Sequence, residues 1–210
     1  MDEAGRGPVL GPLVVAAVML PDDSPLREMQ VRDSKKLSAA KRDALALEIR
    51  KVARVEVRSL EPAEIDGRGA QRSLNVLEAE AFASLIERLR PDEVFVDACD
   101  AVEDNFSRAI RTNLSYMPMM VCKHRADDLY PVVSAASIIA KTVRDARIEE
   151  ISRELGADIG SGYPTDEVTI RFLTNWIKEK GDLPPQARRS WETASRLLRE
   201  SKTRKITDWE

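Results

Sequence analysis

Hydrophobic positions recur with two different periods, and the strand-like period dominates the first half of the chain. Residues 9–20 form an almost unbroken apolar run between glycine and proline signals, which is typical of a buried strand. Residues 54–60 alternate valine with charged side chains, which indicates a half-buried strand. Two shorter apolar runs, residues 94–97 and 117–122, predict further core strands.

Helical spacing appears between these runs and takes over after them. Ser38 is a candidate N-cap for a helix that extends to residue 53. Leucines and alanines recur at helical spacing from Leu74 to Leu89, and Pro91 closes that helix. Residues 132–155 predict a helix whose small side chains allow close packing against a neighbour. Glycines then mark a loop. After it we expect two helices, at residues 166–178 and 191–199, and a polar tail over the last ten residues.

Strands that alternate with helices indicate an α/β fold, here a mixed sheet flanked by helices with a small helical C-terminal appendage. We place the boundary after residue 178, which gives a main α/β domain at 1–178 and an appendage with its tail at 179–210. The length of 210 residues and the hydrophobic fraction of 43% suit a soluble protein with a core of this size.

Composition narrows the function classes only slightly. The net charge of −3 gives no global basic excess, so any nucleic-acid surface must be a local patch. Cys99 and Cys122 lack metal-ligand spacing and are interpreted as buried free thiols. The longest apolar run is too short to span a bilayer and no signal-peptide pattern is present, so we expect a cytoplasmic protein without a membrane partner.

Acidic residues from distant parts of the chain fall at predicted strand ends or just before a helix; they are Asp2, Glu3, Asp97 and Asp127. Open α/β sheets place their ligand sites at such ends. Clustered carboxylates repel one another and need a cation, and hard oxygen ligands favour Mg²⁺ or Mn²⁺ over zinc. Spacing alone leaves a second interpretation open, because a chain with 36 acidic residues also places some of them at strand ends as caps or solvated charges.

Sequence blocks around these acids resemble the ribonuclease HII family. The blocks occur in family order and cover nearly the whole chain, at residues 2–7 (DEAGRG), 33–37 (DSKKL), 96–97 (VD), 126–141 (ADDLYPVVSAASIIAK) and 160–164 (GSGYP), with Asp166 following. The resemblance implies an RNase H-like fold and a hydrolase, an endonuclease of the ribonuclease H type 2 class. It implies Asp2, Glu3, Asp97 and Asp127 as catalytic metal ligands. It also implies hydrolysis on the 5′ side of ribonucleotides in RNA–DNA hybrids or DNA duplexes, leaving 3′-hydroxyl and 5′-phosphate ends.

The resemblance also assigns substrate contacts. In the family, the segment matching Gly5, Arg6 and Gly7, together with the tyrosine matching Tyr163, recognises the ribonucleotide at its junction with DNA. Glycines let the backbone approach a sugar closely, and an arginine can bind phosphate. Without the resemblance, a tight turn and a packed loop aromatic would explain these residues equally well.

Further basic residues are candidates for phosphate contacts; they are Lys35, Lys36 and Lys141. Near the C-terminus, four arginines suggest a basic face on the last helices, although Glu192 and Glu200 dilute it; they are Arg188, Arg189, Arg196 and Arg199.

The chain departs from the family at its ends. Members usually carry several residues ahead of the first aspartate, whereas Asp2 follows Met1 directly, so we expect a short first strand that fixes Asp2 less firmly. The end of the chain resembles a sliding-clamp-binding peptide, with Ile206 as its aliphatic residue and Trp209 as its aromatic residue. It has Thr203 where glutamine is usual and Glu210 in place of a second aromatic, and a frayed tail is the alternative.

Two other functions remain open at this stage. One is a related RNase H-like nuclease that prefers long hybrids or branched DNA. The other is a catalytically silent nucleic-acid-binding or clamp-associated module, which the short first strand alone favours. No apolar dimerisation stripe is visible in the sequence, so we expect a monomer.

Overall fold

The computed structural model describes residues 1–31, 37–69 and 73–207, with side chains to residue 202. Lys35, Lys36 and Trp209 lie outside the described residues, as does the side chain of Ile206. Contacts divide the chain into two compact units. The first unit contains residues 1–4, 14–59 and 70–143, and the second contains residues 5–13, 60–69 and 144–210.

The first unit is built on a mixed sheet. Strand β1 is antiparallel to β2, with Asp2 opposite Ala16, and β3 continues this three-stranded sheet, while β4 and β5 form a parallel pair. The strands are β1 (Asp2–Ala4), β2 (Leu13–Met19), β3 (Arg54–Leu60), β4 (Glu93–Asp97) and β5 (Met119–Lys123).

Met1 links the two parts of the sheet. Its amino group donates to the Phe95 carbonyl oxygen at 2.7 Å, and its own carbonyl accepts from the Asp97 amide at 3.1 Å. One residue that bonds to both neighbours of Val96 follows the pattern of a parallel ladder. The resulting order is β3-β2-β1-β4-β5, with β1 between the parts.

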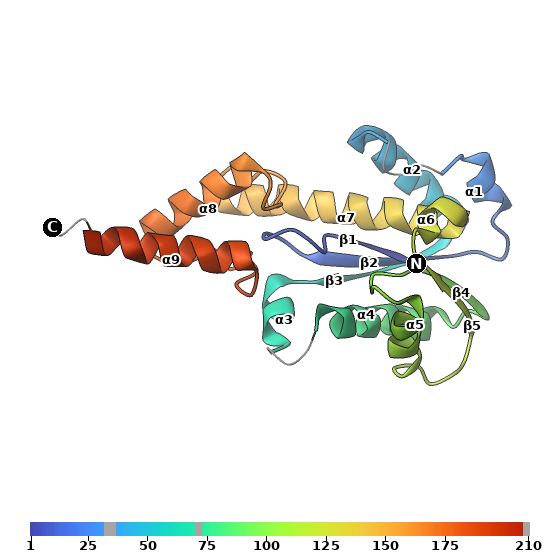
Figure 1. Ribbon diagram of the computed structural model, residues 1–210. Coiled ribbons are helices and arrows are strands. Elements are labelled where there is room, and N and C mark those ends of the chain that lie inside the picture. Colours follow the sequence, from blue (N-terminus) through green and yellow to red (C-terminus); the bar gives the residue numbers. More distant parts are fainter. Residues whose placement is uncertain (32–36, 70–72, 208–210) are drawn as a thin grey trace. The chain divides into compact units, whose positions relative to one another are not determined.

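Helices cover both faces of this sheet (Figure 1). On one face, Ala4, Val14 and Ala16 share a core with the inner sides of α2 and of the first part of α7. On the other face, Phe82 of α4 meets Phe106 of α5 edge to face, with ring centroids 5.3 Å apart. The helices of this unit are α1 (Ser24–Glu28), α2 (Ala39–Val52), α4 (Leu74–Leu89), α5 (Glu103–Arg111), α6 (Ala126–Leu129) and α7 (Pro131–Leu155), which reaches the second unit after Val143.

The second unit packs loops and helices around its own apolar core. Val9 and Leu10 are fully buried with residues of α8 and α9, including Phe172, Leu173 and Leu197. The segment ahead of β2 is fixed by an isolated bridge between Leu10 and Ala187. The helices are α3 (Pro62–Gly67), α8 (Glu167–Lys180) and α9 (Glu192–Thr207).

Most predicted elements are present, with defined exceptions. The run at residues 9–20 is a strand only from Leu13, because Val9 and Leu10 are buried in loop structure of the second unit. Helix α9 continues to Thr207, so the prediction that the last helix ends at residue 199 was wrong, and most of the predicted polar tail is helical. The predicted boundary after residue 178 stays a prediction. Among the described residues, no helix is long and apolar enough to cross a membrane.

Candidate metal centre

Three predicted ligands come together in the first unit. One carboxylate oxygen from each of Asp2, Asp97 and Asp127 lies within 4.8 Å of the other two. Two ligand oxygens on opposite sides of one Mg²⁺ are separated by about 4.2 Å. A small shift of these side chains would therefore let all three bind one ion.

Neighbouring secondary structure places each of these carboxylates. Asp2 begins β1, Asp97 ends β4, and Asp127 lies in the first turn of α6. Asp97 accepts a hydrogen bond from the Ala126 amide at 3.1 Å, which ties the end of β4 to the start of α6. The contact between the end of β4 and the start of α6 thus brings Asp97 and Asp127 to the same place.

Burial and mutual repulsion shape the acidity of this cluster. Asp2 and Asp127 are each 5% exposed. Burial, together with the charge of Asp97, raises the pKa of Asp2 to about 6, although a hydrogen bond from Ser137 works in the opposite direction. Carboxylates that are buried together disfavour ionisation unless a cation compensates them, so this arrangement fits a divalent ion.

Glu3 lies beside this group, outside the set of three. Burial raises the pKa of Glu3 well above its usual value, with the charges of Asp2 and Glu78 adding to the effect. Its Oε2 atom is buried and has no hydrogen-bond partner among the described residues. An orphaned carboxylate oxygen next to Asp2 is available to a bound cation.

Sequence reasoning missed two polar neighbours of the acidic residues, Ser137 and Glu78. Lys141 donates to the Ser137 hydroxyl at 2.8 Å, and Ser137 hydrogen-bonds to Asp2, so the predicted phosphate contact Lys141 is joined to the metal centre. Glu78 on α4 is fully buried and accepts from the Cys99 thiol at 3.3 Å. Its position in an apolar helical stripe was a visible signal, because such stripes rarely include glutamate.

The predicted ribonucleotide-reading residues are brought together in the second unit. A Cβ atom on Gly7 would lie 3.6 Å from the Tyr163 ring, so the glycine lets the loop pack closely against this aromatic. The guanidinium carbon of Arg144 lies 5.0 Å from the centroid of the same ring. Tyr163 as a whole residue is 39% exposed. Gly5 has φ of +92°, and a Cβ there would meet the Pro12 carbonyl at 2.6 Å.

The structure removes Arg188 from the predicted basic face near the C-terminus. Arg188 is fully buried, because its guanidinium binds backbone carbonyl oxygens inside the second unit. Arg189 pairs with Asp182 at 2.6 Å, and Arg196 pairs with Glu200 at 3.0 Å. Pairing with nearby acids weakens the electrostatic attraction that Arg189 and Arg196 can exert on nucleic acid.

Both cysteines are free and half-buried. Burial raises the pKa of the Cys122 thiol to about 12, so this side chain stays protonated and unreactive at neutral pH. The free thiols predicted from the sequence are therefore confirmed, although neither is completely buried.

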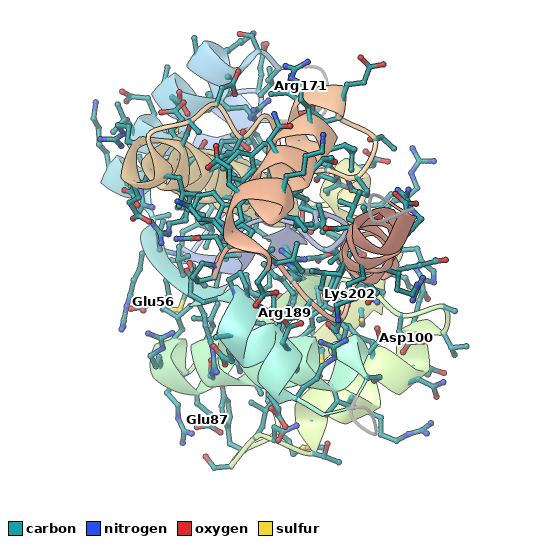
Figure 2. All side chains as sticks on the ribbon, turned by 90° about the vertical axis from the view of Figure 1, so that its left-hand side faces the viewer. Glu56, Glu87, Asp100, Arg171, Arg189 and Lys202 are labelled. Carbon is teal, nitrogen blue, oxygen red and sulfur yellow. The ribbon has the colours of Figure 1, made fainter. Side chains whose placement is uncertain are left out.

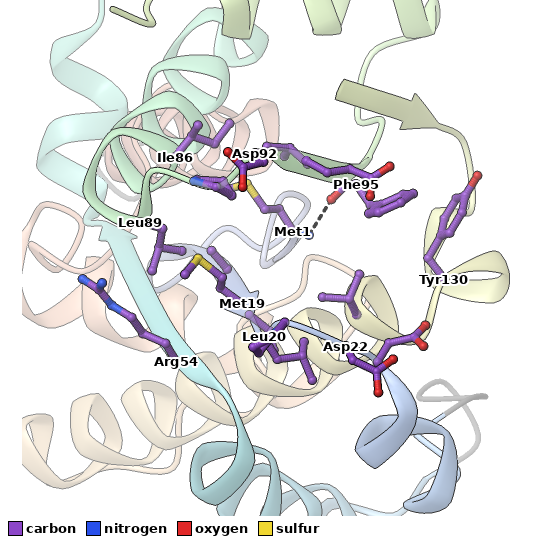
Figure 3. Close-up of a pocket in the computed structure, with 18 of the residues that line it drawn as sticks. Met1, Met19, Leu20, Asp22, Arg54, Ile86, Leu89, Asp92, Phe95 and Tyr130 are labelled. Carbon is purple, nitrogen blue, oxygen red and sulfur yellow. Dashed lines mark hydrogen bonds between the residues drawn. The ribbon is translucent and has the colours of Figure 1, made fainter. Parts of the chain in front are cut away.

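A groove of about 890 Å³ opens in the first unit beside Met1 (Figure 3). It lies between the end of β2, at Met19 and Leu20, and the start of β4, at Glu93 to Phe95. Leu89 of α4 and Tyr130 line it as well. The groove therefore follows the line that β1 would take if it continued ahead of Met1.

Comparison with known proteins agrees with this architecture. A sequence profile of the ribonuclease HII family matches residues 1–194. A ribonuclease HII from Methanocella arvoryzae is 46% identical over 201 residues, which cover 94% of this chain and 90% of the relative. The crystal structure of ribonuclease H2 from Pyrococcus horikoshii OT3 superposes with a TM-score of 0.88 at 40% identity, covering 96% of each chain.

A second solved relative is the ribonuclease HII in a complex with PCNA from Archaeoglobus fulgidus. It has a TM-score of 0.86 and 43% identity, and the match covers 93% of this chain and 94% of that one. The α/β fold with a C-terminal helix is confirmed by these neighbours. The chain therefore belongs to the ribonuclease HII family, and the protein is an enzyme of the type 2 ribonuclease H class.

Proposed function

We propose that this ribonuclease hydrolyses the phosphodiester bond on the 5′ side of a ribonucleotide in an RNA–DNA hybrid or a DNA duplex. The products would carry a 3′-hydroxyl and a 5′-phosphate. The observation that carries the proposal is the cluster of three carboxylates, the buried Asp2 and Asp127 and the half-buried Asp97, with their oxygens within 4.8 Å of one another.

We assign Mg²⁺ or Mn²⁺ to this cluster, with Asp2, Glu3, Asp97 and Asp127 as ligands. The donors are all hard carboxylate oxygens, which suit these ions. A bound divalent ion supplies an activated water and stabilises charge on the scissile phosphate. The protein contributes by holding these acidic side chains near one another, where Ser137 and the Ala126 amide orient Asp2 and Asp97.

Recognition of the ribonucleotide is assigned to Gly5, Arg6, Gly7 and Tyr163. Backbone groups near Gly5 and Gly7 can approach a sugar, and the exposed Tyr163 offers a ring and a hydroxyl to the 2′-hydroxyl side. Lys141 is assigned to a phosphate, as are Lys35 and Lys36.

The decisive experiment uses a labelled DNA duplex with one embedded ribonucleotide, an RNA–DNA hybrid and an all-DNA control. We expect cleavage 5′ to the ribonucleotide with Mg²⁺ or Mn²⁺ and none with chelator. Asp127→Asn should lower the rate by at least about a hundredfold, since one ligand of the ion is lost. The matched control is Asp128→Asn, whose side chain is exposed and paired with Arg125.

Equal cleavage by both variants would contradict the assigned metal centre. Cutting of the long hybrid without cutting of the single-ribonucleotide duplex would point to a hybrid-specific nuclease instead. Absence of cutting with either ion would favour a binding module.

We also propose that the C-terminal tail binds a sliding clamp. The Archaeoglobus fulgidus relative, 43% identical, was solved in a complex with PCNA. Ile206 and Trp209 supply the aliphatic and aromatic groups that such a contact requires.

A further inference from the structure

A buried arginine lies behind the loop of Gly5, Arg6 and Gly7. The guanidinium of Arg188 donates to three backbone carbonyl oxygens, from Nη2 to Gly5 at 2.7 Å, from Nη1 to Arg6 at 3.2 Å and from Nε to Gly11 at 2.9 Å. Its residue exposure is 0%. One side chain thus fixes two successive peptide groups of the loop and the residue at its far end.

Trp191 extends this support by one residue. Its indole Nε1 donates to the Gly7 carbonyl at 3.2 Å, and its ring centroid lies 4.9 Å from the guanidinium carbon of Arg188. The backbone amide of Arg188 also donates to the Val9 carbonyl at 2.8 Å. The carbonyls of Gly5, Arg6 and Gly7 are therefore all bound by Arg188 or Trp191.

Peptide geometry converts this contact into a direction for the loop amides. In a trans peptide the carbonyl of one residue and the N–H of the next point in opposite directions, and the described residues contain no cis peptide bond. Because the Gly5 and Arg6 carbonyls point toward Arg188, the amides of Arg6 and Gly7 point away from it. Two successive N–H donors on one side of a loop form a site for a phosphate or sugar oxygen.

The aromatic side of the same unit is fixed to this loop. The amides of Val9 and Leu10 donate to the Gly162 carbonyl at 2.8 and 3.2 Å, next to Tyr163. Arg144 donates to the Ser161 carbonyl and lies over the Tyr163 ring. The loop amides and the tyrosine therefore keep a constant relation within the second unit.

We propose that Arg188 is a positioning residue for substrate selection, which it performs with Trp191 by aiming the Arg6 and Gly7 amides at the ribonucleotide. This inference rests on the proposed function, since it presumes that the loop recognises the 2′-hydroxyl side of the substrate. Arg188 is too buried to touch substrate, and its effect passes through the backbone. An arginine is required because its planar fork reaches three carbonyls that a lysine ammonium does not bind together.

The test measures discrimination between two duplexes by the full chain. Fluorescence anisotropy gives Kd for a duplex with one ribonucleotide and for the same duplex made of DNA alone, with Ca²⁺ present and strand integrity checked on a gel. Arg188→Lys should reduce the ratio of these two constants about tenfold, as expected when charge-assisted hydrogen bonds that set a site are lost. Mn²⁺ binding to the first unit, followed by calorimetry, should not change.

The matched control is Arg189→Lys, the next residue along the chain. Arg189, labelled in Figure 2, is exposed, and its guanidinium pairs with Asp182 at 2.6 Å. We expect its discrimination ratio to equal that of the unmodified protein. Trp191→Phe is the second variant, which removes the bond to Gly7 while keeping an aromatic ring, and it should lower the ratio severalfold.

The possible results distinguish a positioning role of Arg188 from a purely structural one. A reduced ratio in Arg188→Lys and Trp191→Phe, with Arg189→Lys unchanged, supports the positioning role. Equal weakening of both affinities at a constant ratio overturns it, because a purely structural residue acts in that way. If Arg188→Lys does not fold, an unchanged ratio in Trp191→Phe overturns the proposal. An unmodified protein with a ratio near one overturns the proposed function itself and the positioning role with it.

Discussion

At the scale of single residues, we expect the carboxylates that would bind a metal ion to lower the stability of the metal-free protein. The charge of Asp97 raises the pKa of both Asp2 and Glu3, so without a cation these groups destabilise one another. Asp97→Asn keeps an oxygen for the Ala126 amide while removing that charge. We expect it to raise Tm in chelator by about 2–4 °C, corresponding to roughly 1 kcal/mol, and to abolish most of the Mg²⁺-induced rise in Tm.

The control for this prediction is Glu93→Gln, at the exposed start of the same strand. It should leave both Tm values unchanged. A lower Tm for Asp97→Asn in chelator would show that the carboxylate stabilises the metal-free protein and would contradict the argument.

Asp166 is a second residue with a measurable electrostatic effect. Hydrogen bonds from the amide and hydroxyl of Ser161 lower the pKa of Asp166 to about 2, and the side chain also caps α8 through the Val168 amide. A lowered folded-state pKa stabilises the fold above the unfolded value near 3.8, and this stability is lost as the pH falls toward 2. Asp166→Asn should therefore lower Tm by about 2–4 °C at pH 7 and hardly at all near pH 2.

Thermal unfolding followed by circular dichroism across this pH range checks the prediction. Glu167→Gln, at the exposed next position, is the control and should show no pH-dependent difference. A gap in Tm that persists at pH 2 would mean that Asp166 acts through packing rather than charge.

At the scale of elements, the sequence predicted the long and strongly periodic segments best. The strand at 54–60 and the helix from Leu74 to Leu89 have the predicted bounds, and Ser38 accepts from the Lys41 amide as an N-cap. Short elements such as α3 and α6 have too few residues to show a period, so no pattern could reveal them. Val9 and Leu10 misled the strand prediction because fully buried loop residues look like strand residues in a sequence.

The candidate site was predictable only in part, for a related reason. Spacing placed the aspartates at strand ends, and the family blocks selected among them. The burial of Arg188 was not predictable, because an arginine next to Arg189 in a polar segment looks solvent-exposed until its carbonyl partners, far away in the sequence, are known. Contacts that span the chain determine such roles.

Strand β1 leads to a prediction at the element scale. The groove beside Met1 lies between the end of β2 and the start of β4, and it ends at the buried amino group of Met1. Three residues engineered ahead of Met1, with valine nearest to it, should pair opposite Val18 and beside Phe95. Because an amide then replaces a buried ammonium, we expect an increase in unfolding free energy of about 1–3 kcal/mol.

Denaturant unfolding measures this change, and an extension of the same length containing proline is the control, since proline lacks the N–H that a strand needs. Equal stability of the two extended proteins would show that the groove does not accept a strand. A gain restricted to the valine extension would show that the added residues pair within the sheet.

At the scale of the whole molecule, catalysis and clamp binding should be separable. In the part of α9 whose side chains are described, residues 192–202, the buried residues Ala194 and Leu197 lie near the start of the helix. A chain that stops after Lys202 should therefore keep its Tm and its cleavage of short duplexes while losing affinity for PCNA by at least about tenfold. Trp209→Ala, which leaves the helix at full length, should reproduce the loss.

Surface plasmon resonance with immobilised PCNA, run beside the cleavage assay, measures both properties on the same protein. We expect the two properties to be separable because the truncation keeps Ala194 and Leu197, the buried residues in the described part of α9. If the shortened chain lost activity on short duplexes at an unchanged Tm, the end of α9 would be acting on the substrate itself. Retained PCNA affinity in both variants would place the clamp contact elsewhere on the chain.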